Sequence, residues 1–145
     1  MPEVTESITI DVPGQTVWDF ITEPENNLLV SSNLEEFEQV GEDPVGVGTR
    51  FQGIVKVAGR KLSWSNEVAV YDEPKAFHTR SVESPIDFTY DTDLEPDGDG
   101  TKVTVHQDIG SFGGFFGKLA DPIVLRMYRR DVRANLEKMK ELLEG

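Results

Sequence analysis

The feature that most constrains the fold is a series of strand-like segments joined by very short turns between residues 34 and 109. Turn signals such as Gly59, Pro74 and the stretch DGDG at 97–100 separate segments rich in β-branched and aromatic residues. Strands joined by so few residues must run antiparallel, because a parallel pair needs a long crossover connection. The sequence therefore predicts one antiparallel sheet of six strands in this region.

Helical patterns flank this region on both sides. After a strand expected at residues 4–11, apolar residues recur at helical spacing around Val17 until Pro24, and a second short helix is expected over residues 24–33. Near the C-terminus, Asp121 suits a helix N-cap. An apolar stripe then follows at steps of three and four residues, made of Leu125, Tyr128, Val132, Leu136, Met139 and Leu143. This stripe predicts a long helix that covers one face of the sheet.

The order of elements is therefore strand, two short helices, six strands and a long helix, which is an α+β arrangement. No repeat, linker or low-complexity tract interrupts it, so we expect residues 1–145 to form a single domain. Apolar and polar residues alternate cleanly between Ile86 and Glu95, which predicts one solvent-exposed and one covered face of the sheet.

Five stretches, in this order, carry a resemblance to a known family. They are DVPGQTVWDFITEPEN (11–26), PVGVGTRFQG (44–53), VYDEPKAFHTRS (70–81), DGDGTKVTV (97–105) and RANLEKMKELLE (133–144). The chain resembles the START and Bet v 1-like superfamily, in particular its bacterial polyketide cyclase/dehydrase branch. One departure is that many relatives carry tryptophans where this chain has residues 27–30, so pocket features that depend on those rings do not carry over.

The resemblance implies a helix-grip fold, in which a curved antiparallel seven-stranded sheet wraps around the C-terminal helix and leaves a cavity between them. Members of the superfamily bind lipids, sterols, quinones, plant hormones or polyketide intermediates, and some catalyse cyclisation or dehydration. Because one fold hosts many functions, the resemblance does not choose among these activities.

The inner face of the predicted sheet supplies the candidate ligand-binding residues. Strand registers anchored on the apolar positions point Val68, Val70 and Ser81 toward the helix, together with most of the candidates. The candidates are Phe51, Val55, Trp64, Asn66, Phe77, Thr79, Phe88, Tyr90, Gln107, Phe112, Phe116, Met127 and Tyr128. An apolar wall with sparse polar groups is typical of a small-molecule site. The alternative is a filled core in which these polar groups bond one another or the backbone.

The segment SFGGFFGKLADP at residues 111–122 combines three phenylalanines with three glycines. Its glycine spacing fits neither a dinucleotide fingerprint nor a phosphate-binding loop. The resemblance places it at one end of the cavity, where Phe112, Phe115 and Phe116 would close over an apolar guest. A packed turn at the end of the core and a membrane-touching loop are the alternatives.

No acid–base constellation is evident, so we assign no catalytic residue. His78 and His106 are expected to point outward, away from the cavity, and Glu36 or Glu38 would serve as a buried base only if the strand register turned one inward. No metal site is expected, because the histidines lack ligand spacing and the calcium-loop-like start at Asp93 has no closing glutamate. No cofactor is expected either.

The charge balance limits the partners. With 27 acidic and 14 basic residues, a formal net charge of -13 disfavours nucleic acid and anionic membrane surfaces. Apolar runs are too short for a membrane span, and the absence of cysteine and of a secretory leader predicts a cytoplasmic protein. The arginines of the last helix are expected to pair with Asp131, Glu137 and nearby carboxylates, and a site for an anionic partner is the alternative. The oligomeric state stays open.

Three functional hypotheses follow. The first is noncovalent binding of a small hydrophobic or aromatic molecule, such as a lipid, a quinone or a polyketide-like compound. The second is a cyclase or dehydratase that uses the same cavity, which needs an ionisable group pointing inward. The third is a protein-interaction module, which predicts a filled core and an exposed apolar patch.

Overall fold

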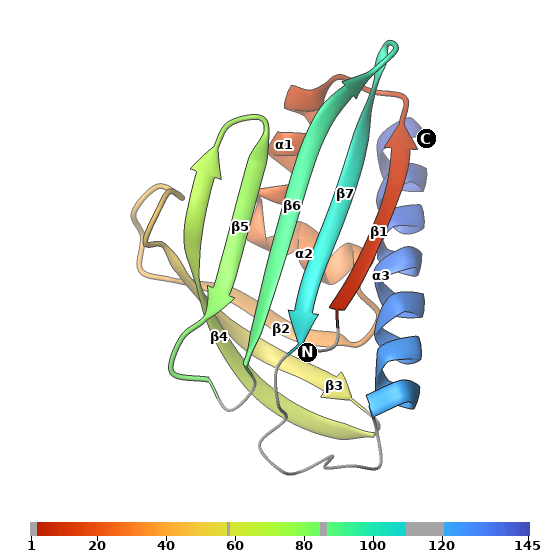
Figure 1. The fold of residues 1–145 in the computed structure, drawn as a ribbon. Coiled ribbons are helices and arrows are strands. Elements are labelled where there is room, and N and C mark those ends of the chain that lie inside the picture. Colours follow the sequence, from red (N-terminus) through yellow and green to blue (C-terminus); the bar gives the residue numbers. More distant parts are fainter. Residues whose placement is uncertain (1–2, 58, 85–86, 110–120) are drawn as a thin grey trace.

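A computed structural model describes residues 3–57, 59–84, 87–109 and 121–145 of the chain, and it has the predicted order of elements (Figure 1). The strands and helices are β1 (Glu3–Ile10), α1 (Gly14–Ile21), α2 (Pro24–Val30), β2 (Leu34–Val40), β3 (Arg50–Val57), β4 (Arg60–Asp72), β5 (Ala76–Ser81), β6 (Phe88–Asp97), β7 (Gly100–Ile109) and α3 (Asp121–Glu144). The fold is the predicted α+β helix-grip arrangement.

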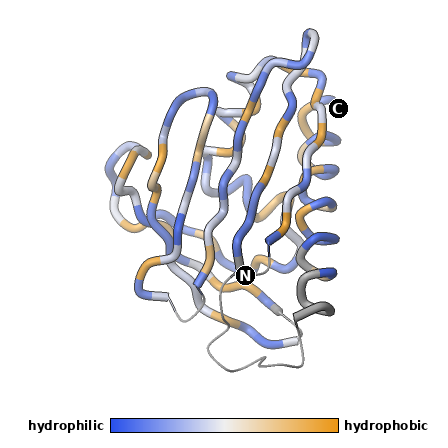
Figure 2. The backbone as a smooth tube through the Cα atoms, in the orientation of Figure 1, coloured by the Kyte–Doolittle hydropathy of each residue, from blue (hydrophilic) through white to orange (hydrophobic). Residues whose placement is uncertain are grey.

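The sheet has seven strands in the order β1-β7-β6-β5-β4-β3-β2, and every neighbouring pair is antiparallel. Short connections enforce this order, as at Gly59, whose φ of 81° suits the tight turn between β3 and β4. Figure 1 shows a curved sheet with α1 and α2 behind it and α3 running along β1. Hydrophobic and hydrophilic residues alternate along the strands, which gives the sheet one covered face (Figure 2).

Proline residues mark the starts of the two short helices. Pro13 is the N-cap of α1, and Pro24 occupies the first turn of α2, where its missing N–H costs no hydrogen bond. Helix α2 stops at Val30, before the predicted residue 33, because Ser31 adopts an extended conformation. In α1, Trp18 is 1% exposed and makes edge-to-face contacts with Tyr71 and Phe77. These rings fix α1 to the sheet.

The buried apolar side chains form two clusters on the covered face. The larger one joins β1, α1, β6, β7 and α3, and it contains Val4, Ile10, Val17, Trp18, Leu94, Val103, Val105, Val132, Leu136 and Met139. The smaller one contains Phe51, Trp64 and Val68 from β3 and β4. Tyr71 and Phe77 pack against both clusters. Two clusters joined by a few side chains leave room between them for a cavity.

The prediction for the end of β4 was wrong. Val70 was expected to point inward, but it is 38% exposed, whereas Tyr71 packs against the core. The pairing of β4 with β5 shifts between Val68 and Val70, so the strand gains one residue relative to its partner. Such a bulge reverses the facing of every residue beyond it.

Helix α3 presents the predicted apolar stripe to the sheet wherever its side chains are described. Val132, Leu136 and Met139 are 2–5% exposed, and Leu143 packs beside them. Of the arginines, Arg133 pairs with Glu137 at 3.1 Å and donates to the Ser7 carbonyl of β1 at 2.9 Å. No helix in the described ranges is both long and apolar enough to cross a membrane.

Candidate functional site

A cavity of about 230 Å³ lies between the two core clusters. Its wall comes from α1, α2, the sheet and α3. The main lining residues are Phe20, Ile21, Asn26, Asn27, Val30, Asn33, Leu34, Phe37, Phe51, Val55, Trp64, Asn66, Phe77, Thr79, Phe88, Tyr90, Thr92, Val105, Gln107, Asp131, Val132, Asn135, Leu136 and Met139. The cavity is therefore mostly apolar and aromatic, with a few amides and hydroxyls.

Most of the predicted ligand-binding residues meet in this wall. They are Phe51, Val55, Trp64, Asn66, Phe77, Thr79, Phe88, Tyr90 and Gln107. Met127 does not join them: its side chain is 40% exposed, and among the described side chains of α3 the lining begins at Asp131. Phe112, Phe116 and the rest of the 111–117 segment lie outside the described residues, as does the side chain of Tyr128.

One end of the cavity is built from aromatic rings that pack against one another at an angle. Phe37 lies 5.0 Å from Trp64 and 5.3 Å from Phe51 between ring centroids, and Phe88 meets the edge of Trp64 at 6.5 Å. Phe37 was missing from the candidate list. It stands between the exposed glutamates Glu36 and Glu38 in β2, so the alternation of LEEFEQV was a signal that could have placed it inward.

Most polar side chains near α1 and α2 are hydrogen-bonded within the protein. Asn26 and Asn27 donate to the carbonyls of Phe20 and Pro24 at 3.0 and 3.2 Å. The Ser31 hydroxyl donates to Asn33 at 2.8 Å. These bonds hold the two short helices in shape at the edge of the cavity, and they leave little polarity there for a ligand.

An ionisable side chain that sequence reasoning missed also lines the cavity. Asp131 of α3 accepts a hydrogen bond from Asn33 Nδ2 at 3.2 Å. Burial raises the pKa of its carboxyl above the usual 3.8, and the charge of Arg130 opposes this in part. The signal was its position beside Val132 and four residues before Asn135, on the face that carries the apolar stripe. Glu36 and Glu38, the carboxylates considered earlier, are exposed.

Tyr90 lies in the cavity wall as a neutral group. Burial raises the pKa of its phenol to about 12, so the hydroxyl keeps its proton at neutral pH. The Tyr90 hydroxyl can therefore act as a hydrogen-bond donor. Thr79, on the neighbouring strand, donates its own hydroxyl to the Tyr90 backbone carbonyl at 3.2 Å.

The two histidines lie on the outer face of the sheet, as predicted. His78 Nε2 lies 2.8 Å from Asp93, and His106 Nδ1 lies 2.7 Å from the Thr5 hydroxyl. Burial raises the pKa of Asp91 between them, and the two histidines oppose that shift. Within the described part of the chain, no group of three or more histidine, cysteine, aspartate or glutamate side chains is arranged to hold a metal ion.

Solved structures with the same fold come from bacteria and plants. A protein of Thermus thermophilus, TTHA0849, is 22% identical with a TM-score of 0.85, over 98% of this chain and 97% of its own. The ZhuI aromatase/cyclase of Streptomyces is 18% identical with a TM-score of 0.77, over 98% and 93%. The major latex-like protein 151 of Panax ginseng is 14% identical with a TM-score of 0.76, over 99% and 97%.

Sequence comparison identifies the family. No curated protein sequence matches this chain. The sequence model of the family described as "Polyketide cyclase / dehydrase and lipid transport" matches residues 1–144. This match confirms the resemblance drawn from the five sequence stretches, and the fold supports the binding of hydrophobic ligands. The chain belongs to the polyketide cyclase/dehydrase and lipid transport family.

Proposed function

We propose that this protein binds one small hydrophobic or aromatic molecule, such as a lipid, a quinone or a polyketide-like compound, without forming a covalent bond. The observation that carries the proposal is the cavity of about 230 Å³ between the sheet and α3, with its aromatic wall. An engineered apolar cavity of about 150 Å³ is enough to bind benzene. The space here therefore suits a ligand of more than one ring or a comparable chain.

Apolar burial supplies the affinity in this proposal. Each Å² of apolar ligand surface removed from water contributes about 25 cal/mol to binding. A ligand enclosed in the cavity is therefore held mainly by contact with the aromatic and aliphatic side chains of the wall. A protein-interaction module with a filled core is the weaker candidate, because a cavity of this size occupies the place where the core would be filled.

Native mass spectrometry of gently purified protein tests the proposal, followed by extraction of whatever is bound under denaturing conditions. We expect a hydrophobic adduct at one molecule per chain, or binding of a compound from a panel of lipids, quinones and polycyclic aromatics in a thermal-shift assay. If neither an adduct nor any stabilising compound is found, the proposal is wrong.

A matched pair of variants assigns the binding to the cavity. Val55 lines the cavity from β3, whereas its neighbour Ile54 faces the other side of the sheet, opposite Ser63. Val55→Trp fills part of the cavity and should weaken binding about tenfold or more, while Ile54→Trp places the same ring outside the cavity and should leave binding unchanged. Equal loss in both variants would place the ligand elsewhere.

A cyclase or dehydratase is the second candidate, and Asp131 is the observation that favours it. In this reaction the Asp131 carboxylate takes a proton from a carbon between two carbonyls. That carbon then forms a bond to a third carbonyl carbon, whose oxygen takes the proton from Asp131 and becomes a hydroxyl. Its raised pKa makes the carboxylate a stronger base than an exposed aspartate. The test is the conversion of a short poly-β-keto thioester, followed by mass spectrometry, with Asp131→Asn expected to abolish it. Unchanged conversion by this variant would remove Asp131 from the reaction.

A further inference from the structure

Two buried polar atoms, on side chains that line the cavity, have no hydrogen-bond partner among the described residues. They are the indole nitrogen Nε1 of Trp64 and the carboxamide oxygen Oδ1 of Asn66. The two side chains are 7% and 6% exposed. They stand two residues apart on β4, so they face the same side of the sheet, and both line the cavity.

Among the described residues, the neighbours of these two side chains are aromatic rings and Ser81, whose hydroxyl already donates to Asp87. Phe37 and Phe88 pack against Trp64, and Asn66 lies opposite Phe51 in the pairing of β3 with β4. Aromatic rings exclude water but supply no ordinary hydrogen bond. A buried donor or acceptor left unpaired destabilises the fold, so native structures contain few of them without a reason.

The rest of the wall makes the pair distinctive. The Thr79 hydroxyl is bonded to the Tyr90 carbonyl, and the amides of Asn26 and Asn27 are bonded to carbonyls of the short helices. The fold therefore bonds these groups internally, whereas Trp64 Nε1 and Asn66 Oδ1 are buried and unpaired at the aromatic end. An unpaired N–H and an unpaired carbonyl oxygen can bind a ligand that brings one oxygen acceptor and one hydroxyl donor.

Charge adds a second constraint on the ligand. The residues that line the described cavity include no lysine, arginine or histidine, and their one ionisable acid is Asp131. A bound anion would be buried without a cation and would face a carboxylate. The cavity therefore favours a neutral molecule over a fatty-acid anion or a phosphate ester.

We propose that Trp64 and Asn66 select a neutral, oxygenated aromatic ligand of about two fused rings. A carbonyl or phenol oxygen of the ligand accepts from Trp64 Nε1, and a hydroxyl group donates to Asn66 Oδ1. The rings of Phe37, Phe51 and Phe88 enclose the carbon framework. This inference rests on the proposed binding function and assigns its specificity to two named atoms.

A graded series of ligands tests the inference by isothermal titration calorimetry. The series consists of tetralin, which has no oxygen, 1-tetralone, which has an acceptor, and the 5-, 6- and 7-hydroxy-1-tetralones, which add a donor at different places. We expect affinity to rise along the series, with the best hydroxytetralone binding about tenfold or more tighter than tetralin.

Nuclear magnetic resonance identifies the donor directly. The chain has two tryptophans, and Trp18 lies in the core outside the cavity lining. Binding of 1-tetralone should therefore move the indole N–H resonance of Trp64 downfield, as a new hydrogen bond requires. The Trp18 resonance should stay in place and serves as the internal control.

Two variants test the acceptor. Asn66→Leu removes Oδ1 at similar size, and we expect it to bind tetralin at least as well as the wild type but to lose the preference for the hydroxytetralones. Thr79→Val is the matched control, because the Thr79 hydroxyl is already bonded within the fold and the preference should persist. The indole measurement on the wild-type protein keeps the test valid even if Asn66→Leu does not fold.

The outcomes separate this inference from the function on which it rests. If tetralin and the hydroxytetralones bind equally and the Trp64 resonance does not move, the specificity inference is wrong while hydrophobic binding stands. If the cavity binds none of the series, and gentle purification and the compound panel also reveal no ligand, both are wrong.

Discussion

At the scale of single residues, Asp131 is a carboxyl group that the fold holds in an unfavourable place. Burial raises its pKa in the folded protein above the usual 3.8, so the folded state binds the proton more tightly than the unfolded state does. Stability linked to this group is therefore highest in acid and falls as the pH rises through the raised pKa. A group that lowers stability at neutral pH is typical of a site kept for function.

Replacing Asp131 by asparagine should consequently raise the melting temperature at pH 7. The change removes the partly buried charge but keeps an oxygen that accepts from Asn33. The difference in melting temperature from the wild type should vanish well below the usual pKa of 3.8, because the carboxyl is then protonated in both the folded and the unfolded protein. Thermal unfolding across this pH range checks it, with the exposed Asp99→Asn as the control for the altered net charge. A lower melting temperature at pH 7 would show that the carboxylate stabilises the fold.

Gly53 makes room for the ring of Trp64. A Cβ at this position would meet the Glu36 carbonyl oxygen of β2 and lie 2.7 Å from Cζ2 of Trp64. We expect Gly53→Ala to destabilise the fold by about 1–3 kcal/mol, because either the β2–β3 pairing or the ring must move. Gly46→Ala is the control, since nothing lies within 4 Å of a Cβ there. Chemical denaturation measures both, and equal stability of the two variants would contradict the argument.

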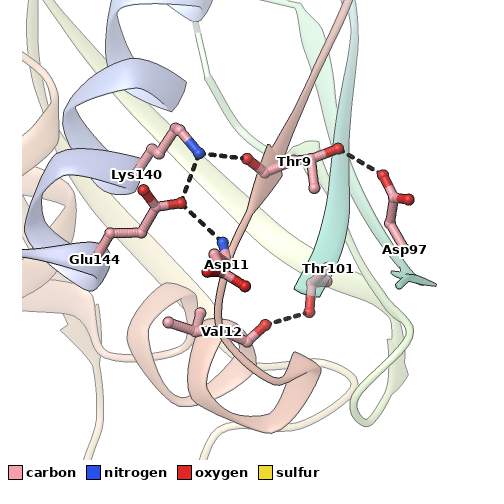
Figure 3. Close-up of polar contacts among 7 residues, drawn as sticks. All are labelled: Thr9, Asp11, Val12, Asp97, Thr101, Lys140 and Glu144. Atoms are coloured by element: carbon pink, nitrogen blue, oxygen red, sulfur yellow. Dashed lines mark hydrogen bonds and ion pairs between the residues drawn. The ribbon is translucent and has the colours of Figure 1, made fainter. Parts of the chain in front are cut away.

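At the scale of elements, polar contacts fix the end of α3 to β1 (Figure 3). Lys140 Nζ donates to the Thr9 carbonyl at 2.8 Å and to Glu144 at 2.5 Å, and Glu144 accepts from the backbone N–H of Asp11 at 2.8 Å. The hydrogen bond from Lys140, followed by that from Asp11, lowers the pKa of Glu144 below its usual 4.5. This contact therefore stabilises the fold only while Glu144 is ionised.

Glu144→Gln should lower the melting temperature at neutral pH, whereas Asp131→Asn should raise it. Stability from a lowered pKa is fully present above the usual 4.5 and is lost as the pH falls through the lowered value, so wild type and variant should converge in acid. Glu141→Gln is the matched control, because its pair with Lys138 spans 3.7 Å on an exposed surface. Equal effects of the two substitutions at pH 7 would mean that the contact with β1 contributes nothing.

The elements also show how far sequence reasoning reaches. Turn residues and helical spacing predict the type and order of every strand and helix. Short connections permit only one pairing pattern, and the fixed φ of Pro24 suits the first turn of a helix. The bulge between Val68 and Val70 lies beyond such reasoning, since strict alternation cannot reveal an inserted residue. The cavity wall was predicted in large part from strand registers. Phe37 was missed because glutamates flank it, and Asp131 was missed because it stands among arginines with which it was expected to pair.

At the scale of the whole molecule, charge and cavity act on a ligand in the same direction. The chain carries a net charge of -13, and the described cavity wall adds Asp131 but no lysine, arginine or histidine. The first effect acts at long range through water and is screened by salt, whereas the second acts at contact. Anions should therefore be disfavoured both on approach and once bound.

A comparison of 1-decanol with decanoate at pH 7.5 separates the two effects. Both have the same chain, so we expect decanoate to bind about tenfold or more weakly because its charge is buried unpaired. In about 1 M salt the screening length falls to about 3 Å, which removes the long-range repulsion. A gap that persists in salt and narrows in Asp131→Asn would assign the selectivity to the cavity, and a gap that closes in salt alone would assign it to the net charge. Binding of decanoate as tight as that of decanol would contradict a cavity built for neutral ligands.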